Sequence, residues 1–362
     1  MIIGPTLGRY FARHFIRAVL IVFGTVFALI YTLDLVELMR RAGDAEGAST
    51  SMMAMLALFR TPAVAEQVLP FAILFGAMAT LLNLSRKLEL VIARSAGVSA
   101  WEFLQPPVLV ALLVGVVAIT IYNPFAAHLK QHASQVEARI FAKSQKFQPG
   151  KEQWLRERRP EGEVIIRADQ VIENSTTLNR VTFFNFKPDG SFLDRIEAKT
   201  ATLEHGYWNI SDGRVISAGA PPQPFSTKQV ASALDAAQVR RAFTPPESVP
   251  LWQLPQVIER TEKAGLDATG YRLQFDVLIA RPMLFVAMVL VAASFSLRFF
   301  RFGGVAKMVL SGVVAGFVLY VATELMQDLG GSGMLGTAVA AWFPAITGAL
   351  LGVLALLYQE DG

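Results

Sequence analysis

Six long runs of this sequence contain no Asp, Glu, Lys or Arg. The shortest has 16 residues, and most approach the roughly 20 apolar residues that a helix needs to cross a bilayer. Beyond the shorter runs apolar residues continue, and a flanking Arg or Lys can extend to the membrane interface. The pattern predicts six transmembrane helices, with buried core helices of a soluble protein as the alternative. The runs are Ala18–Leu33, Gln67–Ser85, Phe103–Leu129, Pro282–Leu297, Met308–Thr323 and Leu329–Gln359.

The segment between the third and fourth runs has a different composition. Residues 130–272 hold 20 of the 33 Lys and Arg residues and 17 of the 29 Asp and Glu residues. We therefore expect a soluble domain inserted into a membrane protein. The predicted order is transmembrane helices 1–3 over residues 1–129, the soluble domain over 130–272, and transmembrane helices 4–6 over 273–362.

Short β-like runs follow one another in this soluble domain without helices between them. Pro188-Asp189-Gly190 and Ser211-Asp212-Gly213 are turn sequences, and Leu251–Ala264 has a helical pattern. We expect an antiparallel, all-β domain, either a sandwich or an open jelly roll. The strand-like runs are Val164–Ile166, Val181–Phe186, Arg195–Leu203 and Tyr207–Ser217.

Basic residues divide unevenly between the short loops on the two sides of the predicted membrane. One side has only Arg40, Arg41 and Arg60. Because cytoplasmic loops are rich in Lys and Arg, we expect the other side, which includes both termini, to be cytoplasmic and the β-domain to be periplasmic. The basic residues of that side are Arg9, Arg13, Arg17, Arg86, Lys87, Arg94, Arg298, Arg301 and Lys307.

The chain lacks the motifs of several enzyme classes. It has no G-x-x-x-x-G-K-[ST] phosphate loop, no H-E-x-x-H zinc motif and no G-x-S-x-G nucleophile turn. His128 and His132 have the spacing of one helix face, but no third ligand lies near them in sequence, so no metal site is predicted. We expect a protein that is not an enzyme and that takes its energy from a partner or an ion gradient.

Two alternatives to a partner-driven transporter remain open. An ion-coupled carrier would use carboxylates at the ends of the spans, although none lies in the middle of a run. A membrane-anchored scaffold would use the β-domain only to bind proteins. The carboxylates near span ends are Asp34, Glu66, Glu324 and Asp328.

A short amphipathic helix is predicted around residues 84–97, between the second and third spans. Arg86, Glu89 and Arg94 lie away from its apolar stripe, and Gly97 ends it. The helix either lies at the membrane interface, with Arg86 and Glu89 as an internal i,i+3 pair, or docks a partner protein. The apolar stripe consists of Leu84, Leu88, Val91 and Ile92.

Arg40 and Arg41 place two cations at the outer end of the first span, within Met39-Arg-Arg-Ala-Gly43. This position runs against the positive-inside bias and suits a ligand with phosphate or carboxylate groups. The simpler explanation is a solvated helix C-terminus, where cations are favoured.

Three motifs resemble one known family. They are Asp-Leu-Val-Glu-Leu-Met-Arg-Arg-Ala-Gly at 34–43, Arg-Lys-Leu-Glu-Leu-Val at 86–91 with Ser-Ala-Gly at 95–97, and Gly-Tyr-Arg-Leu-Gln-Phe at 270–275. With the layout of the whole chain, they resemble the LptF/LptG permeases of the lipopolysaccharide exporter. The Arg-Arg-Ala-Gly ending is most similar to the Lys-Lys-Ala-Gly of the LptG branch.

The resemblance implies a permease subunit of an ABC-type exporter in the bacterial inner membrane. Such a subunit extracts lipopolysaccharide from the outer leaflet and passes it through a periplasmic β-jelly-roll. The implied partners are an LptF-like permease, an LptB-like ATPase dimer, and LptC-like and LptA-like periplasmic proteins. The chain itself is expected to bind no cofactor, because the partner ATPase uses the ATP and Mg²⁺.

The resemblance also assigns residues to the coupling of ATP hydrolysis to transport. Residues 84–97 correspond to the family's coupling helix, with Glu89 reaching into a groove of the ATPase. Arg86, Arg94 and Gly97 belong to the same segment.

The remaining implied sites face the substrate and the lateral gate. Arg40, Arg41 and Lys130 are the cations expected to hold lipid phosphates, although relatives often have Lys where this chain has Asp34. Gly312 and Gly316 form a G-x-x-x-G in the fifth span, as a gate helix requires, and packing inside one bundle is the alternative.

Overall fold

A computed structural model describes most of the chain. The described residues are 5–42, 49–95, 97–141, 153–159, 162–171, 177–204, 206–217, 219–232, 245–263, 266–300 and 305–360. They divide into two compact units. The helical unit comprises Met1–Glu137, Pro250–Trp252 and Arg272–Gly362, and the β unit comprises Ala138–Val249 and Gln253–Tyr271.

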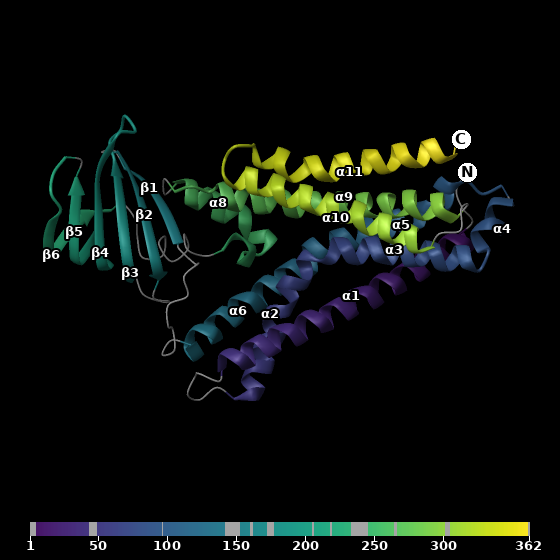
Figure 1. Ribbon diagram of the computed structural model, residues 1–362, viewed down its shortest axis with the longest axis horizontal. Helices are drawn as coiled ribbons and strands as arrows, with labels where there is room; N and C mark the ends of the chain where they lie inside the picture. The colour runs from purple at the N-terminus through teal and green to yellow at the C-terminus, as the bar shows by residue number, and fades with distance from the viewer. Residues whose placement is uncertain are drawn as a thin grey trace. The chain divides into compact units, whose positions relative to one another are not determined.

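The helical unit confirms the prediction of six membrane-spanning helices, because six of its helical stretches are long and apolar enough to cross a bilayer (Figure 1). The expected boundary at residue 130 lies inside a helix that continues to Phe141. The helices are α1 (Pro5–Ala42), α2 (Thr50–Gln67), α3 (Leu69–Arg86), α4 (Glu89–Ser95), α5 (Ala100–Val117), the π-helical turn η1 (Ala118–Tyr122), α6 (Asn123–Phe141), α9 (Thr269–Phe300), α10 (Val305–Gly331) and α11 (Thr337–Glu360).

Large apolar side chains from α1, α3 and α9 fill the centre of the helical unit. Phe15, Ile73, Leu74 and Phe285 are fully buried there. Burial is very uneven among the helices. In the most apolar stretch of α1 only 6% of residues are buried, whereas in α3 67% are. The outer helices therefore leave much apolar surface for lipid or another chain to cover.

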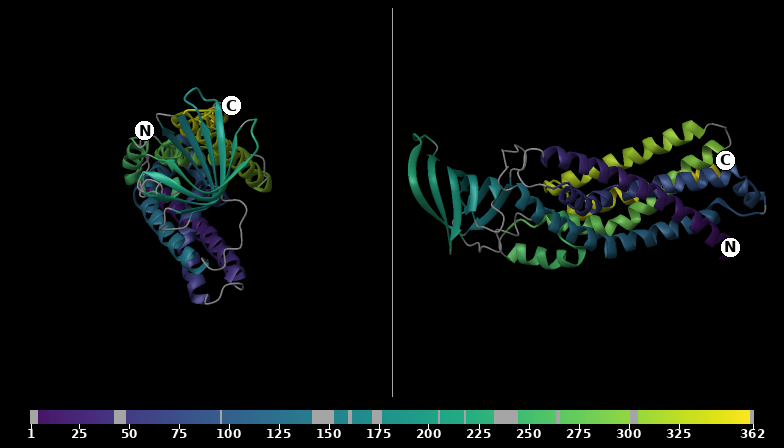
Figure 2. Two further views of the ribbon diagram at one scale, coloured as in Figure 1. Left: turned by 90° about the vertical axis from the view of Figure 1, so that its left-hand side faces the viewer. Right: turned by 90° about the horizontal axis from the view of Figure 1, so that it is seen from below.

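The β unit is one antiparallel sheet in which each strand pairs with the next along the chain. Figure 2 shows the sheet strongly curved. The all-β expectation is confirmed, and the described strands form a meander where we expected a sandwich or open jelly roll. The strands are β1 (Gln153–Arg159), β2 (Gly162–Val171), β3 (Thr177–Phe186), β4 (Phe192–Glu204), β5 (Tyr207–Ser217) and β6 (Gln223–Ala231).

One face of this sheet carries the core of the β unit, which includes Ile166, Phe183, Trp208 and Ile210. The predicted turn at Ser211-Asp212-Gly213 is wrong, because β5 continues through it. A Cβ on Gly213 would lie 2.5 Å from the carbonyl oxygen of Glu197 on β4, so a glycine is needed for strand approach rather than for a turn.

The helix expected over Leu251–Ala264 begins later than predicted. Leu251–Gln253 is a 3-10 turn, η3, that follows another, η2 (Pro246–Ser248), and the α-helix α8 runs over Leu254–Lys263. Ala264 lies outside the described residues. Pro255 lies in the first turn of α8, where a missing N–H costs no helical hydrogen bond.

Close helix packing at Gly115 of α5 gives a stability prediction. A Cβ there would lie 2.5 Å from the Cα of Pro282 on α9, whereas Gly24 of α1 has no atom within 4 Å of the same position. We expect Gly115→Ala to destabilise the purified full chain in detergent by about 1–3 kcal/mol through overpacking. Gly24→Ala is the matched control and should be neutral or slightly stabilising. Equal melting temperatures for both variants would contradict this packing.

Candidate functional site

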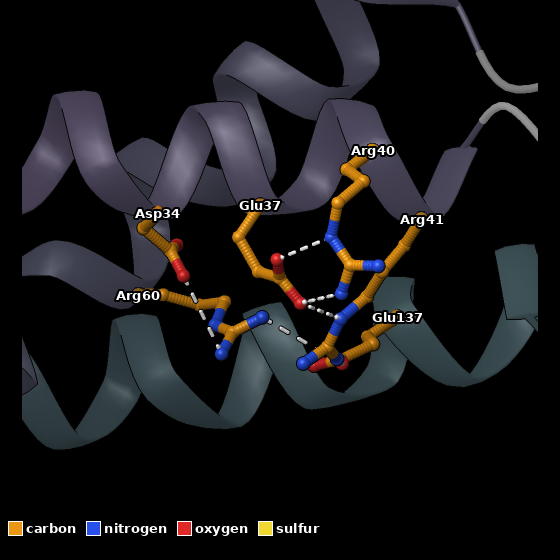
Figure 3. A network of polar contacts seen from close by, with 6 residues as sticks. All are labelled: Asp34, Glu37, Arg40, Arg41, Arg60 and Glu137. Atoms are coloured by element: carbon orange, nitrogen blue, oxygen red, sulfur yellow. Dashed lines mark hydrogen bonds and ion pairs between the residues drawn. The ribbon is translucent and has the colours of Figure 1, made fainter.

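Six charged side chains form a network at the C-terminal end of α1 (Figure 3). Glu37 is its centre. Arg40 donates to both of its carboxylate oxygens at 2.8 Å, and Arg41 Nε donates to Oε1 at 2.8 Å. The three residues lie one turn apart on one helix face, as i,i+3 and i,i+4 spacing requires.

Two further helices join this network. Arg60 of α2 lies 3.5 Å from the carboxylate of Asp34 and 3.6 Å from that of Glu137 on α6. Arg41 also approaches Glu137, at 4.0 Å. The network therefore connects α1, α2 and α6 through charged side chains near the C-terminal end of α1.

The structure places the predicted substrate cations Arg40 and Arg41 together, but it also gives them a shared carboxylate partner. Arg40 is the most accessible, with 72% of its side chain exposed. The network balances three guanidinium groups with three carboxylates, so an arriving phosphate must compete with Glu37. The third predicted cation, Lys130, lies on α6 seven residues before Glu137, the residue through which α6 enters the network.

Asp34 has a local explanation here. Its Oδ1 faces Arg60, while its buried Oδ2 has no hydrogen-bond partner among the described residues. A lysine at this position would face Arg60 as a like charge. An acid at 34 therefore matches the arginine at 60.

A second polar cluster is buried in the helical unit and was missed by the sequence reasoning. Glu66 of α2 accepts hydrogen bonds from Arg281 of α9 and from Asn123 of α6, the latter at 3.0 Å. The side chains of Arg281 and Glu66 are only 13% and 8% exposed. Asn123 Oδ1 also accepts from the backbone N–H of Leu251 at 3.1 Å.

Glu66, one of the carboxylates near the ends of the predicted spans, is therefore buried and paired with an arginine. Arg281 immediately precedes a charge-free run, and α9 begins twelve residues before it. The available signal was an Arg inside a long apolar helix, because such a charge needs a buried partner. Glu66 is the nearest acid in space but lies 215 residues away in sequence.

The predicted coupling segment is a short helix after a sharp break in the backbone. α3 ends at Arg86, Leu88 adopts a left-handed φ of 60°, and α4 then begins at Glu89. Figures 1 and 2 place α4 at the same end of the helical unit as both termini. The network around Glu37 lies toward the other end of α1.

The break corrects the predicted apolar stripe of this segment. Leu84 is buried as expected, but α4 turns Leu90 inward instead, where it packs in the same cluster. Leu88, Val91 and Ile92 are 57%, 42% and 64% exposed. Helical spacing counted across residues 84–92 fails because the left-handed residue resets the rotation of the helix.

The predicted internal pair of Arg86 and Glu89 is also wrong. Arg86 ends one helix and Glu89 begins the next, so the i,i+3 geometry is lost. Instead, the Tyr10 hydroxyl of α1 donates to Glu89 Oε1 at 3.1 Å.

The predicted coupling residues Arg94 and Gly97 lie at the C-terminal end of α4. The Arg94 guanidinium lies 5.9 Å from the centre of the Phe103 ring, a cation–π contact with α5. Gly97 has a φ of +87° and donates to the carbonyl of Arg94 at 3.0 Å, which ends the helix. Ser99 and Glu102 then form a capping box that starts α5.

Gly312 and Gly316 of α10 face α3 of the same chain. A Cβ on Gly312 would lie 2.4 Å from Met78, and one on Gly316 would lie 2.2 Å from Leu74. Both glycines thus allow close packing inside one bundle, and their role in a gate stays a prediction.

Potential metal ligands do not gather in the part of the chain that the structure describes: it contains no group of three His, Asp or Glu side chains able to hold a metal ion. His128 and His132 both lie on α6.

Comparison with known proteins shows similarity along nearly the whole chain. The family model for the lipopolysaccharide export system permeases LptF/LptG matches residues 9–358. The permease protein LptG of Haemophilus influenzae is 24% identical over 357 residues, which cover 96% of this chain and 94% of that protein. LptG of Escherichia coli K12 is 21% identical over 355 residues, covering 95% and 94%.

The buried ion pair gives a stability prediction that distinguishes it from an exposed ion pair. Glu66→Ala leaves the Arg281 guanidinium buried without its acid, which should cost about 3–5 kcal/mol of stability. Adding Arg281→Met should recover part of this loss, because no unpaired charge then remains. Melting temperatures of the purified variants measure both effects.

The matched control is the exposed pair of Lys263 and Glu259 on α8, 2.6 Å apart. This contact holds the pKa of Glu259 below its usual range, but water solvates either charge when the other is removed. Glu259→Ala should therefore change the melting temperature little. A double variant less stable than Glu66→Ala alone would show that charge is not the reason for the loss.

Proposed function

The chain belongs to the LptF/LptG family of lipopolysaccharide export permeases, and we propose that it is the LptG-type permease subunit of an ABC exporter. The family match spans residues 9–358, which confirms the resemblance seen in the sequence. Family membership and six apolar helices make it a protein of the inner membrane. The observation that supports a subunit driven by another protein is the surface of α4, where apolar side chains are exposed beside Glu89.

The proposed energy source is an LptB-like ATPase dimer that binds ATP and Mg²⁺. Leu88, Val91 and Ile92 offer an apolar contact surface, and Glu89 supplies a carboxylate for charge-assisted hydrogen bonds. Arg86, Arg94 and Gly97 frame this surface. Movement of the ATPase is transmitted through α4 to α3 and α5, to which it is connected by only short links.

The proposed partner in the membrane is an LptF-like permease. The most apolar stretches of α1 and α10 are only 6% and 17% buried within this chain. A second permease covers these faces, and the two chains enclose a cavity between them. Gly312 and Gly316 set how closely α10 packs on α3 at this gate.

In the proposed transport step, lipopolysaccharide enters this cavity from the outer leaflet. Its phosphates displace Glu37 from the guanidinium groups of Arg40 and Arg41, and Lys130 on α6 is a further cation. ATP binding favours a collapsed cavity, and this population shift drives the lipid onward. The β unit then passes the acyl chains along its apolar core face to LptC-like and LptA-like proteins.

The proposed orientation has both termini and α4 in the cytoplasm and the β unit in the periplasm. It rests on the nine basic residues in the short loops of one side against three on the other. The termini and α4 lie at one end of the helical unit, as this orientation requires.

A second candidate is an ion-coupled lipid carrier, which the buried Glu66 and Arg281 favour because charges inside a membrane often mark ion pathways. The two mechanisms differ in what they need. An ion-coupled carrier moves lipid across the periplasmic bridge without the ATPase, whereas the ABC exporter stops when ATP hydrolysis stops.

Charge substitutions at Arg40 and Arg41 test the substrate site. Changing both to Glu should lower the lipopolysaccharide retained by the purified complex about tenfold or more, since a hydrogen bond to a charged group contributes about 1.5–3 kcal/mol. Changing both to Ala should have an intermediate effect, and changing both to Lys the smallest, because Lys keeps the charge but loses the bidentate contact. Lipid is quantified by mass spectrometry at equal protein yield.

The control for this test is Arg9→Glu with Arg13→Glu, the same charge change at the other end of α1. Glu37→Gln adds a second arm, because it removes the carboxylate charge that both guanidinium groups share and should raise retention. Unchanged lipid in the Arg40 and Arg41 variant would remove these residues from the substrate site.

Glu89→Ala tests the coupling role. The substitution removes one exposed hydrogen bond, so the melting temperature should change little, while copurification of the ATPase or export per ATP hydrolysed should fall. Tyr10→Phe removes the same hydrogen bond and keeps the carboxylate. It should leave both readouts near the unsubstituted level. Equal losses in the two variants would mean that Glu89 only fastens α4 to α1.

A further inference from the structure

A groove between α1 and α3 is not used by the proposed function. It has a volume of 410 Å³, within the range of small-ligand sites. It lies in the half of α1 opposite to the network around Glu37. Its lining residues are His14, Arg17, Ala18, Ile21 and Val22 of α1 and Ala79, Thr80, Asn83 and Lys87 of α3.

Two contacts show that the helices forming this groove run antiparallel. Tyr10 bonds to Glu89 just beyond the end of α3, and a Cβ on Gly76 would lie 2.5 Å from Val19. Residue numbers thus rise along α1 as they fall along α3. His14, Asn83 and Lys87 therefore lie toward the polar end of the groove, and Ile21, Val22 and Ala79 lie toward the more apolar end, which also includes Thr80.

The polar end is cationic. The side chains of Arg17 and Lys87 have no acidic partner among the described residues, and His14 and Asn83 lie beside them. The dipole of α3 alone explains a cation at its C-cap residue, Lys87. It does not explain Arg17, which lies inside the 38-residue helix α1.

The apolar end continues from these cations along both helices. Ile21 lies one turn beyond Arg17, and Ala79 lies two turns before Lys87, so an extended apolar chain can follow the groove away from the charges. A phosphate ion would fill only the cationic end. The combination of unpaired cations and an apolar extension matches a phosphate group that carries an acyl chain.

We infer that this groove binds an anionic phospholipid of the leaflet on the α4 side, with its phosphate at Arg17 and Lys87 and one acyl chain along Ile21, Val22 and Ala79. The assignment of this leaflet to the cytoplasmic side rests on the orientation proposed above. The lipid is distinct from the lipopolysaccharide substrate, whose proposed cations lie at the other end of α1.

The position of the groove connects lipid binding to the coupling segment. His14 Nδ1 donates a hydrogen bond to the backbone carbonyl oxygen of Tyr10, 3.0 Å away, and the centres of the two rings lie 4.2 Å apart. Tyr10 in turn donates to Glu89, and Lys87 forms the C-cap of α3 directly before α4. A bound lipid bridges α1 and α3 and steadies the base of α4.

The test measures phosphatidylglycerol retained by the purified complex in nanodiscs made mainly of phosphatidylcholine, by native mass spectrometry. Arg17→Gln with Lys87→Gln should reduce retention about fivefold or more, or about 1 kcal/mol. Arg9→Gln with Arg13→Gln removes the same charge from exposed positions of α1 outside the groove and should retain the lipid. Equal losses in the two variants would indicate unspecific attraction to the membrane surface and overturn the site.

A second arm leaves the cations in place. Ile21→Trp fills the apolar end and should also release phosphatidylglycerol, whereas Leu20→Trp, on an exposed neighbour outside the groove lining, should not. Inorganic phosphate added to the unsubstituted complex should displace little lipid. Full displacement by phosphate, together with no effect of Ile21→Trp, would show a free-phosphate site and overturn the lipid assignment.

The failure of this proposal can be distinguished from the failure of the proposed function. The Arg40 and Arg41 variant, measured in the same nanodiscs, should lose lipopolysaccharide but keep phosphatidylglycerol. Loss of the first lipid without the second supports two sites on α1. Loss of both would overturn the separate site.

Discussion

The ion pair of Glu66 and Arg281 joins the two parts of the helical unit that the β unit separates in sequence. Glu66 lies on α2 and Arg281 on α9, and Asn123 connects both to α6. Neither charge is stable alone in an apolar interior, so each requires the other and the amide to satisfy its bonds. This requirement fixes the angle at which each of the three helices is rotated about its own axis. The packing of Gly115 against Pro282, one residue after Arg281, depends on the same rotation.

The same exclusion of charge from hydrocarbon concentrates the remaining ionic residues at the ends of the helices. At one end, the arginines around Glu37 are balanced by carboxylates and partly exposed, which suits exchange with an anionic lipid. At the other, Glu89 and three exposed apolar residues form the surface that we propose for the ATPase partner. α1 extends between these ends, from Tyr10 at the coupling segment to Arg41 in the network. One helix therefore carries contacts at both proposed sites.

The described helices leave the chain incomplete as a membrane bundle. α1 and α10 expose apolar faces that lipid or a second permease must cover, while α3 is largely buried among its neighbours. Membrane helices associate through close packing rather than through loss of water. The glycines of α10 satisfy this requirement inside the chain, against Met78 and Leu74. The helix proposed as part of a gate thus also packs closely within the bundle of this chain.

The residue pattern was sufficient to predict the six helices, because charge is costly in a bilayer and its absence locates each span. It was also sufficient to predict the all-β insertion, because the β-like runs there follow one another without helices between them. The motifs at 34–43 and 86–91 were sufficient for the family. The partners of individual side chains were not predictable in this way. Glu66 finds Arg281 across 215 residues, and Glu89 bonds to Tyr10 instead of Arg86, because one left-handed residue, Leu88, turns α4. Which face of a helix meets which neighbour depends on the rotation of each helix about its axis, and only packing of the whole chain sets that angle.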